Sequence, residues 1–247
     1  MIVHTSAIVF KAIDYQESSK IVTLFTEEHG KIAVIVKGAK KPKNKFSGLM
    51  EPGRLLDVIY YYKSSRSVQI LTEASLLENL LNLRMDFEKM ATATSAIELF
   101  SQLLHENEIN KPFFEFAKKF LIWLDETKNA PRKIFPYVQI RLTQLMGLGI
   151  RLELNDSQID SSYYLDIESG LVSESSGTGS NTFKLTQNQI SYVSQTLKGK
   201  GSRVFEIDFN RGELKELVRL LDRYLKYHVE GLRDRKSDAI FEQILQD

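Results

Sequence analysis

The stretch KIVTLFTEEHGKIAVIVKG, residues 20–38, decides the fold of the N-terminal part of this chain. Residues 20–26 and 31–37 are rich in β-branched and aromatic side chains, which favour extended strands. His29 and Gly30 lie between the two runs and supply the turn residues. The stretch therefore predicts a β-hairpin.

Three further strand-like runs surround this hairpin, at residues 7–12, 55–62 and 68–72. Proline and glycine fall between the runs, where no ladder hydrogen bonds are required; they are Gly38, Pro42, Gly48, Pro52 and Gly53. Five short strands in about 75 residues are typical of a small closed or partly closed barrel. We predict such a barrel as a first domain, residues 1–80.

The hydrophobic period changes after residue 80. Apolar residues recur at steps of three and four over 90–104 and again over 214–228, which indicates amphipathic helices. Further helices are predicted at 113–124, 134–146 and 240–245. The second domain, residues 81–247, is therefore predicted to be mainly helical, with a small irregular or hairpin insert at 152–184 that contains short β-like pieces at 163–167 and 170–173. The fold class is α+β.

Composition excludes several classes of protein. The chain has 247 residues, a net charge of +1 and no cysteine, so it contains neither disulfides nor a thiolate nucleophile. Its longest apolar runs fall well short of the roughly 20 residues that span a bilayer, and its N-terminus lacks the features of a secretory signal. We expect a cytoplasmic protein without a membrane partner.

The motifs of common enzymes are also missing. The four histidines are scattered, and the patterns H-E-x-x-H, G-x-S-x-G and G-x-x-x-x-G-K-[ST] do not occur. We therefore predict no catalytic residue, no metal site and no cofactor.

The segment KGAKKPKNKFSG, residues 37–48, carries five lysines and no acid in a nearly neutral chain. Residues 31–66 contain nine basic residues and only two acidic ones. Phe46 lies among the lysines, and Tyr60 and Tyr62 share one face of the next strand. Lysines that contact phosphates beside aromatic rings that stack on bases are typical of sequence-tolerant nucleic-acid binding. The alternative is that the tyrosines fill the barrel and the lysines only aid solubility.

The predicted nucleic-acid site combines this segment with nearby basic residues. Its members are Lys37, Lys40, Lys41, Lys43, Lys45, Phe46, Arg54, Lys63 and Arg66. Lys11 and Lys31 are candidates to extend it.

Residues 15–53 closely resemble the N-terminal domain of the RecO family of bacterial recombination mediators. The matching features are Glu17 and Ser18 before the second strand, TLFT at 23–26, the turn Gly30, the basic segment, and the approach to the fourth strand at 49–52. The resemblance continues more loosely at 85–100, 145–154 and 231–237, so it covers nearly the whole chain.

The resemblance implies a barrel of the OB type followed by a helical domain. It implies binding of single- and double-stranded DNA, annealing of complementary strands, and loading of RecA onto DNA coated by single-strand-binding protein (SSB), together with RecR and RecF. It also implies association with the nucleoid. In the family the SSB tail docks on the helical domain, for which basic side chains are available at Arg132, Lys133, Arg141, Arg219, Arg223 and Lys226.

Many members of the family carry a zinc-binding insert with two C-x-x-C pairs. The corresponding positions here are Ser157 and Asp160, then Ser173 and Ser176. Serine hydroxyls are poor zinc ligands beside thiolates. We therefore expect a degenerate, zinc-free insert that packs around Tyr163, Tyr164, Leu165 and Leu171.

Two other functions remain open from the sequence. Small barrels with basic loops also bind RNA, so an OB-type RNA-binding protein is one alternative. A scaffold that binds partners through its helical half is the other, and in that case the basic segment is incidental.

Overall fold

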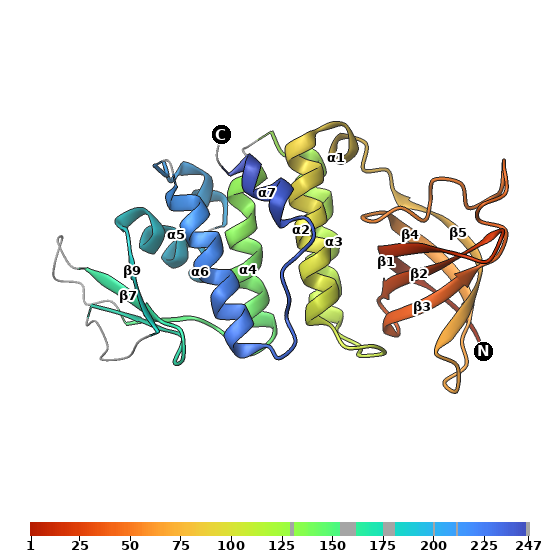
Figure 1. The fold of residues 1–247 in the computed structure, drawn as a ribbon, viewed down its shortest axis with the longest axis horizontal. Coiled ribbons are helices and arrows are strands. Elements are labelled where there is room, and N and C mark those ends of the chain that lie inside the picture. The colour runs from red at the N-terminus through yellow and green to blue at the C-terminus, as the bar shows by residue number, and fades with distance from the viewer. Residues whose placement is uncertain (129–130, 154–161, 175–180, 200, 211, 246–247) are drawn as a thin grey trace. The chain divides into compact units, whose positions relative to one another are not determined.

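The computed structural model describes residues 1–128, 131–153, 162–174, 181–199, 201–210 and 212–245. The chain forms two compact units, Met1–Thr127 and Lys128–Asp247, whose elements are labelled in Figure 1. Among the described residues, no helix combines the length and apolar character needed to cross a membrane.

Five strands form a closed barrel at the N-terminus, which confirms the predicted fold class. They are β1 (Ile2–Tyr15), β2 (Ser19–Thr26), β3 (Gly30–Val36), β4 (Leu55–Tyr61) and β5 (Val68–Glu78). Their order around the barrel is β1-β2-β3-β5-β4, and only the β3–β5 pairing is parallel. β1 and β5 are longer than predicted.

The predicted hairpin is β2–β3, in register from Lys20 opposite Val36 to Thr26 opposite Gly30. Gly30 has a φ of +63°, and a Cβ at this position would come within 1.8 Å of the Glu108 carbonyl oxygen. Only glycine therefore allows the hairpin turn to pass beneath the chain at Glu108.

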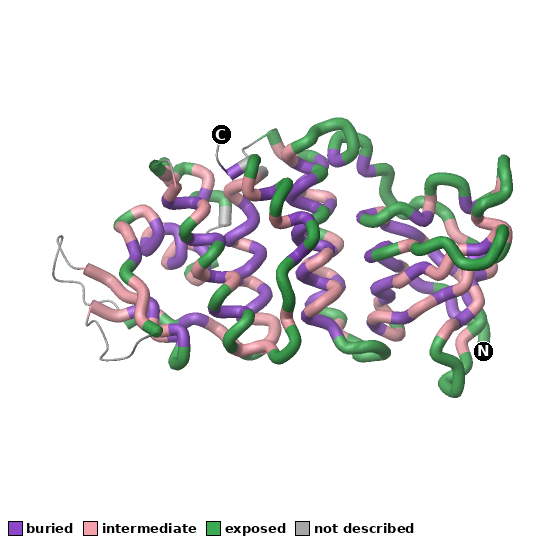
Figure 2. The backbone as a smooth tube through the Cα atoms, viewed as in Figure 1, coloured by how far each residue is buried: buried purple, intermediate pink, exposed green. Residues whose placement is uncertain are grey.

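The barrel interior is filled by alternate residues of each strand, and these appear as the buried segments in Figure 2. Tyr60 is fully buried, Tyr62 packs against the same core, and Tyr61 points to the opposite face and is 48% exposed. The predicted alternation of these tyrosines is confirmed.

Three helices complete the first unit: α1 (Asn82–Met85), α2 (Phe87–Leu103) and α3 (Lys111–Glu126). Asp86 and Asn110 cap the last two by accepting hydrogen bonds from backbone amides of the first turn. Phe25 on β2 packs edge-on against Phe113 and Phe114 of α3, with ring centroids 5.8 and 5.3 Å away. The compact unit thus extends beyond residue 80, where the sequence placed the end of the first domain.

The second unit is built on helices α4 (Ile134–Leu145), α5 (Gln187–Leu197), α6 (Glu213–His228) and α7 (Asp238–Ile244), with short 3₁₀ turns at Pro131–Lys133 and Gly201–Glu206. The predictions at 134–146 and 214–228 match α4 and α6. The sequence pattern predicted no helix at α5, although Thr186 and Gln189 form a capping box there.

The insert forms a small sheet, in which the β-like pieces predicted at 163–167 and 170–173 correspond to two antiparallel strands. Its strands are β6 (Arg151–Leu152), β7 (Tyr163–Asp166), β8 (Leu171–Ser173) and β9 (Thr182–Leu185), in the order β6-β8-β7-β9. Leu165 and Val172 are buried in the hydrophobic core of the unit, and Tyr163 packs against that core. Ser157, Asp160 and Ser176 lie outside the described residues, and Ser173 ends β8. With no cysteine in the chain, these side chains do not fit a zinc ion.

Candidate nucleic-acid interface

The basic loop, residues 37–48, follows β3 and is anchored to the barrel through its own side chains. Phe46 is only 6% exposed and belongs to the barrel core. The Asn44 amide donates hydrogen bonds to the carbonyls of Ala39 and Lys41, at 2.9 and 2.6 Å, and its oxygen accepts one from the amide of Phe46 at 2.7 Å. The lysines are therefore carried on a folded loop.

Two further contacts fasten the basic loop to the strands on either side of β3. On the β2 side, the Lys40 amide donates to the Ser18 carbonyl at 3.0 Å. On the β5 side, the Lys45 ammonium donates to the Thr72 carbonyl at 2.7 Å. Because β3 lies between β2 and β5, the loop crosses the end of the barrel from one neighbour to the other.

Three lysines of the basic loop keep their ammonium groups available. Lys37, Lys41 and Lys43 are exposed. Across the described ranges, none of the hydrogen bonds and ion pairs of the structure involves these three ammonium groups. They are the members of the predicted site best placed to meet a phosphate.

Lys40 is partly neutralised by an acid that the sequence did not suggest. Its ammonium lies 3.1 Å from a carboxylate oxygen of Asp14, which also pairs with Lys20 at 2.9 Å. The hydrogen bond from Lys20, followed by that from Lys40, lowers the pKa of Asp14. Asp14 therefore stays charged at neutral pH beside the basic loop.

The arginine and lysine residues outside the loop separate into two groups. The Arg54 side chain is 11% exposed, donates to the Gly48 carbonyl at 3.0 Å and pairs with Glu51 at 3.4 Å, so it shapes the loop. Lys63 and Arg66 are exposed on the β4–β5 turn. The buried Gln69 side chain organises that turn through hydrogen bonds of 2.7 to 3.2 Å to its backbone.

The aromatic side chains that were expected to stack on bases lie inside the barrel. The ring of Phe46 is buried, with the Lys45 ammonium 5.2 Å from its centroid, so the stacking role expected for Phe46 requires correction: here the residue is an anchor. Burial raises the pKa of Tyr60 to about 12, and His29 Nδ1 is 2.8 Å from its hydroxyl. The tyrosines of this face thus fill the barrel, as the alternative interpretation proposed.

The two candidate extensions differ from each other. Lys11 is exposed on β1. Lys31 donates to the Ser101 carbonyl at 2.9 Å, and burial lowers its pKa. Lys31 therefore serves the contact between β3 and α2 and does not extend the site.

Sequence reasoning missed the polar residues that shape the site, namely Asn44, Gln69 and Asp14. For Asn44 there was a weak signal in the sequence. Asparagine is common in turns, where its side chain forms hydrogen bonds with nearby backbone groups. Gln69 and Asp14 had none, since their contacts depend on how the β4–β5 turn folds and on where the basic loop meets the end of β1.

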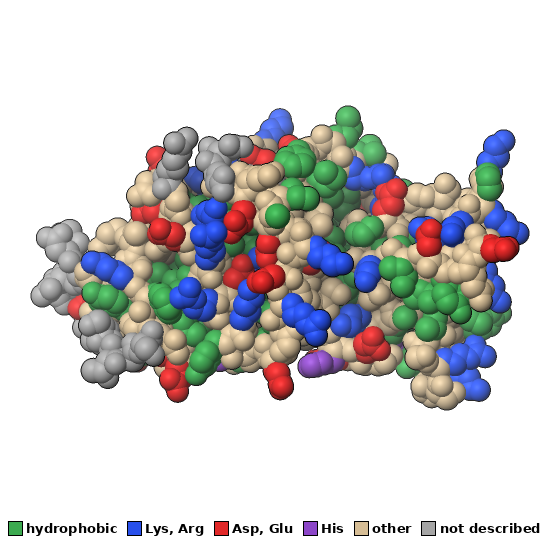
Figure 3. Space-filling view, in the orientation of Figure 1, with side chains coloured by type: hydrophobic (Ala, Val, Ile, Leu, Met, Phe, Trp, Pro, Cys, Tyr) green, Lys and Arg blue, Asp and Glu red, His purple; other side chains and the backbone are tan. Residues whose placement is uncertain are grey.

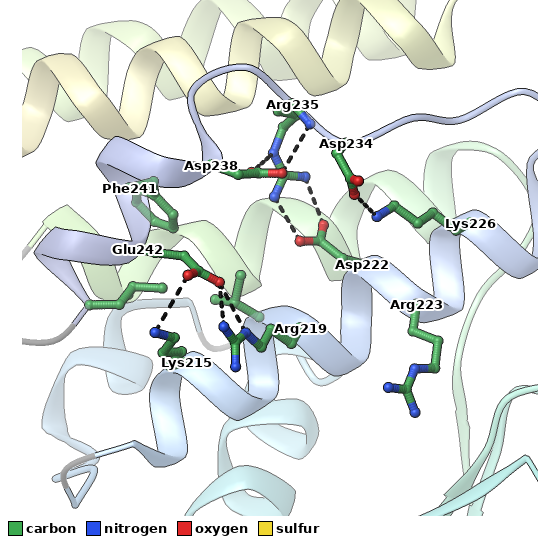
Figure 4. A pocket seen from close by; sticks show the side chains of 12 residues that line it. Lys215, Arg219, Asp222, Arg223, Lys226, Asp234, Arg235, Asp238, Phe241 and Glu242 are labelled. Carbon is green, nitrogen blue, oxygen red and sulfur yellow. Dashed lines mark hydrogen bonds and ion pairs between the residues drawn. The ribbon is translucent and has the colours of Figure 1, made fainter.

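A groove of about 370 Å³ lies between α6 and α7 in the second unit (Figure 4). Arg219, Arg223 and Lys226 line it, together with apolar Val218, Phe241 and Leu245. Glu242 of α7 already occupies the basic side, 2.7 Å from Arg219 and 3.5 Å from Lys215. Three of the six basic residues that the sequence makes available for an acidic tail thus line one groove.

The other three lie elsewhere in the second unit. Lys133 donates to the Ile207 carbonyl at 2.8 Å, and Arg141 donates to the Gln144 side chain. Arg132 lies in the 3₁₀ turn before α4. The structure therefore does not gather all six into one surface.

Comparison with known proteins places both halves of the chain in one family. Residues 1–80 match the family described as Recombination protein O N terminal, and residues 84–238 match Recombination protein O C terminal. The "DNA repair protein RecO" of Chlorobium limicola is 29% identical over 99% of both chains. The protein of the same name from Salinibacter ruber is 26% identical over 98% of this chain and 94% of its own.

These matches extend over the barrel, the helices that follow it and the small sheet, in the same order along the chain. The chain therefore belongs to the RecO family of DNA repair proteins.

Proposed function

We propose that this protein is a DNA-binding recombination mediator. It binds single- and double-stranded DNA through the basic loop, anneals complementary strands, and helps RecA to assemble on SSB-coated single strands together with RecR and RecF. The observation that carries the proposal is the folded basic loop, pinned at Ser18 and Thr72, which presents Lys37, Lys41 and Lys43 with free ammonium groups. The proposal includes no catalytic step, and binding to DNA would place the protein at the nucleoid.

Annealing needs charge neutralisation rather than bond chemistry. Two strands repel each other as polyanions, and lysines that contact their phosphates release condensed counterions, so affinity falls steeply as salt rises. Lysine is suited to this task because its ammonium group, on a flexible side chain, can bind the phosphates of a DNA strand without contacting the bases.

The groove between α6 and α7 supports a second contact, with the acidic tail of SSB. Its lining combines basic Arg219 and Arg223 with apolar Val218, Phe241 and Leu245, next to Lys226, which pairs with Asp234, and the acids Asp222, Asp238 and Glu242. The ion pairs of Glu242 with Lys215 and Arg219 support this proposal, because a carboxylate of a partner would meet the same cations. For RecR and RecF no contact surface is proposed.

The test is annealing of complementary oligonucleotides precoated with SSB, over a salt series, with wild-type protein and the double variant Lys41→Ala/Lys43→Ala. We expect the variant to bind more weakly and its salt slope on single strands to flatten by about 0.7 for each phosphate that it no longer neutralises. Lys119→Ala, which removes an exposed lysine on α3, is the matched control and should behave as wild type.

Two results would contradict the proposal. Unchanged affinity of the double variant at physiological salt would show that the basic loop is not the site. Tighter binding of an RNA strand of the same sequence, with no annealing of DNA, would favour the RNA-binding alternative.

A further inference from the structure

The helix α7 brings an acidic and an apolar side chain to the groove between α6 and α7, here called the α6–α7 groove. Phe241 is 1% exposed, and its ring centroid lies 4.6 Å from that of Phe135 on α4. Glu242, the next residue, points toward Lys215 and Arg219 of α6 (Figure 4). A segment of this chain thus places in the groove the two kinds of group that an acidic, apolar peptide tail carries.

The carboxylate of Glu242 occupies the cations that a tail would need. One of its oxygens accepts hydrogen bonds from Arg219 Nε at 3.0 Å and Nη2 at 2.7 Å, and the other lies 3.5 Å from the Lys215 ammonium. The hydrogen bond from Arg219 lowers the pKa of Glu242, which is therefore charged at neutral pH. A carboxylate of a partner can pair with Arg219 in the same way only after Glu242 has left.

The part of the groove that α7 leaves open is small. Its volume of about 370 Å³ lies near the lower end of the range of small-molecule sites, about 300–1,000 Å³. Arg223 lines this space, and its guanidinium lies 4.5 Å from the centroid of the Phe183 ring. Figure 3 shows Lys and Arg side chains lying among Asp and Glu side chains over α6 and α7. A tail of several residues therefore needs the place that Phe241 and Glu242 occupy.

The attachment of α7 is strongest at its beginning. Arg235, which precedes the helix and is buried, makes hydrogen bonds of 2.7 Å to Asp222 and Asp238. The helix itself has only seven residues, and isolated helices shorter than about 12–15 residues are marginal in water. The part of α7 after Asp238 is therefore helical because it packs in the groove, and the Arg235 cluster is a fixed point from which that part can detach.

We propose that α7 is an autoinhibitory segment, and that an acidic, apolar peptide tail binds the α6–α7 groove by displacing the part of α7 after Asp238. A carboxylate of the tail then replaces Glu242 on Arg219. An apolar side chain of the tail replaces Phe241 against Phe135. The inference rests on the proposed function, since it takes the SSB tail as the ligand, and it adds the regulation of that contact: the apparent affinity is lowered by the fraction of molecules in which α7 closes the groove.

The experiment measures binding of a fluorescent peptide of the acidic SSB tail to full-length wild type, Glu242→Gln and Glu230→Gln. Glu242→Gln keeps the shape of the side chain and removes the charge that competes for Arg219. Glu230→Gln, the matched control, removes the same charge from an exposed acid just after α6. Because each exposed ion pair changes an equilibrium by a factor of up to about five, we expect Glu242→Gln to bind the peptide about three- to ten-fold more tightly. The control should stay within about two-fold of wild type.

Amide hydrogen exchange tests the displacement itself. When the peptide binds wild type, exchange at residues 239–245 should become faster, because these amides leave the groove, whereas exchange in α6 should become slower. Slower exchange in both helices would show that the tail binds beside α7, and it would overturn the autoinhibition. This measurement needs no variant, so it decides the matter even if Glu242→Gln loses its fold in circular dichroism.

Failure of the inference and failure of the proposed function give different results. Equal affinity of wild type and Glu242→Gln for the SSB peptide would overturn the inference and leave the SSB contact in place. A peptide that binds neither protein would contradict the SSB contact. In that case a fluorescent peptide with residues 237–247 of this chain is the probe: tighter binding to Glu242→Gln than to wild type would support a detachable α7, and equal or no binding would overturn it.

Discussion

Lys40 and Asp14 form an ion pair of 3.1 Å at the edge of the surface proposed to meet DNA. Lys40 belongs to a segment without a single acid, so its compensation comes from another strand end, where Asp14 precedes the β1–β2 turn. The same carboxylate pairs with Lys20 at 2.9 Å. An acid thus limits the positive field of the basic loop.

Replacement of this acid should tighten DNA binding. Asp14→Asn removes a charge that repels phosphates and releases Lys40 from its ion pair. We expect a gain in single-strand affinity of up to about five-fold at low salt that fades as salt rises. Fluorescence anisotropy would measure it, with Asp57→Asn, an acid paired with His4, as control. Equal gains for both variants would indicate a general charge effect.

The Asn44 side chain is predicted to hold the basic loop in its folded form. Asn44→Ala removes three hydrogen bonds to loop backbone, and the groups left without a partner should cost the barrel about 1–2 kcal/mol. DNA affinity should fall as well, because the lysines must then be ordered on binding. Urea unfolding and anisotropy measure the two effects, and Asn79→Ala on an exposed turn serves as control. Full affinity with lower stability would show that the loop need not be preformed.

Glycine at position 30 should be irreplaceable. Gly30→Ala adds a Cβ that meets the Glu108 carbonyl oxygen at 1.8 Å, in addition to the strain of a φ of +63°. Gly38 has a comparable φ of +73°, but a Cβ there would have no neighbouring atom closer than 3.9 Å. The loss of stability in Gly38→Ala therefore measures the backbone strain alone, about 1–2 kcal/mol. We expect Gly30→Ala to destabilise the first unit well beyond Gly38→Ala in urea titrations. Equal losses would mean that the chain at Glu108 moves aside freely.

Arg235 is predicted to fasten α7 to α6. Its guanidinium makes two 2.7 Å bonds to Asp222 and one of 2.7 Å to Asp238, its side chain is 5% exposed, and it lies 5.0 Å from the Phe135 ring centroid. Arg235→Ala leaves two carboxylates without their partner and should cost about 3–5 kcal/mol.

Thermal unfolding followed by circular dichroism measures this loss. Lys236→Ala, which removes the exposed neighbouring charge, should leave the transition unchanged. A loss below about 1 kcal/mol for Arg235→Ala, the range of a surface pair, would show that the cluster does not hold α7.

Most strands and helices could be predicted from local patterns in the sequence. The alternation in residues 20–37 and the turn at Gly30 lead to β2 and β3 because each strand exposes one face to the barrel core. The helix α5 was missed because seven of its eleven residues are Gln, Asn, Ser or Thr, which leaves only a short apolar period. In the small sheet, the β-like pieces at 163–167 and 170–173 were predicted, whereas β6 and β9 were not, because strands of two to four residues that pair across distant segments leave little period in the sequence.

For the site, the sequence by itself determined the concentration of lysines between two strands and the placement of Tyr61 on the opposite face of its strand from Tyr60 and Tyr62, without saying which face lines the barrel interior. Both follow from composition and from the two-residue period of a strand. Only the tertiary structure decided that Phe46 is an anchor, that Asp14 compensates Lys40, and that Tyr60 and Tyr62 lie on the inner face of the barrel. Those relations depend on barrel closure and on strand register, which join residues that are far apart along the chain.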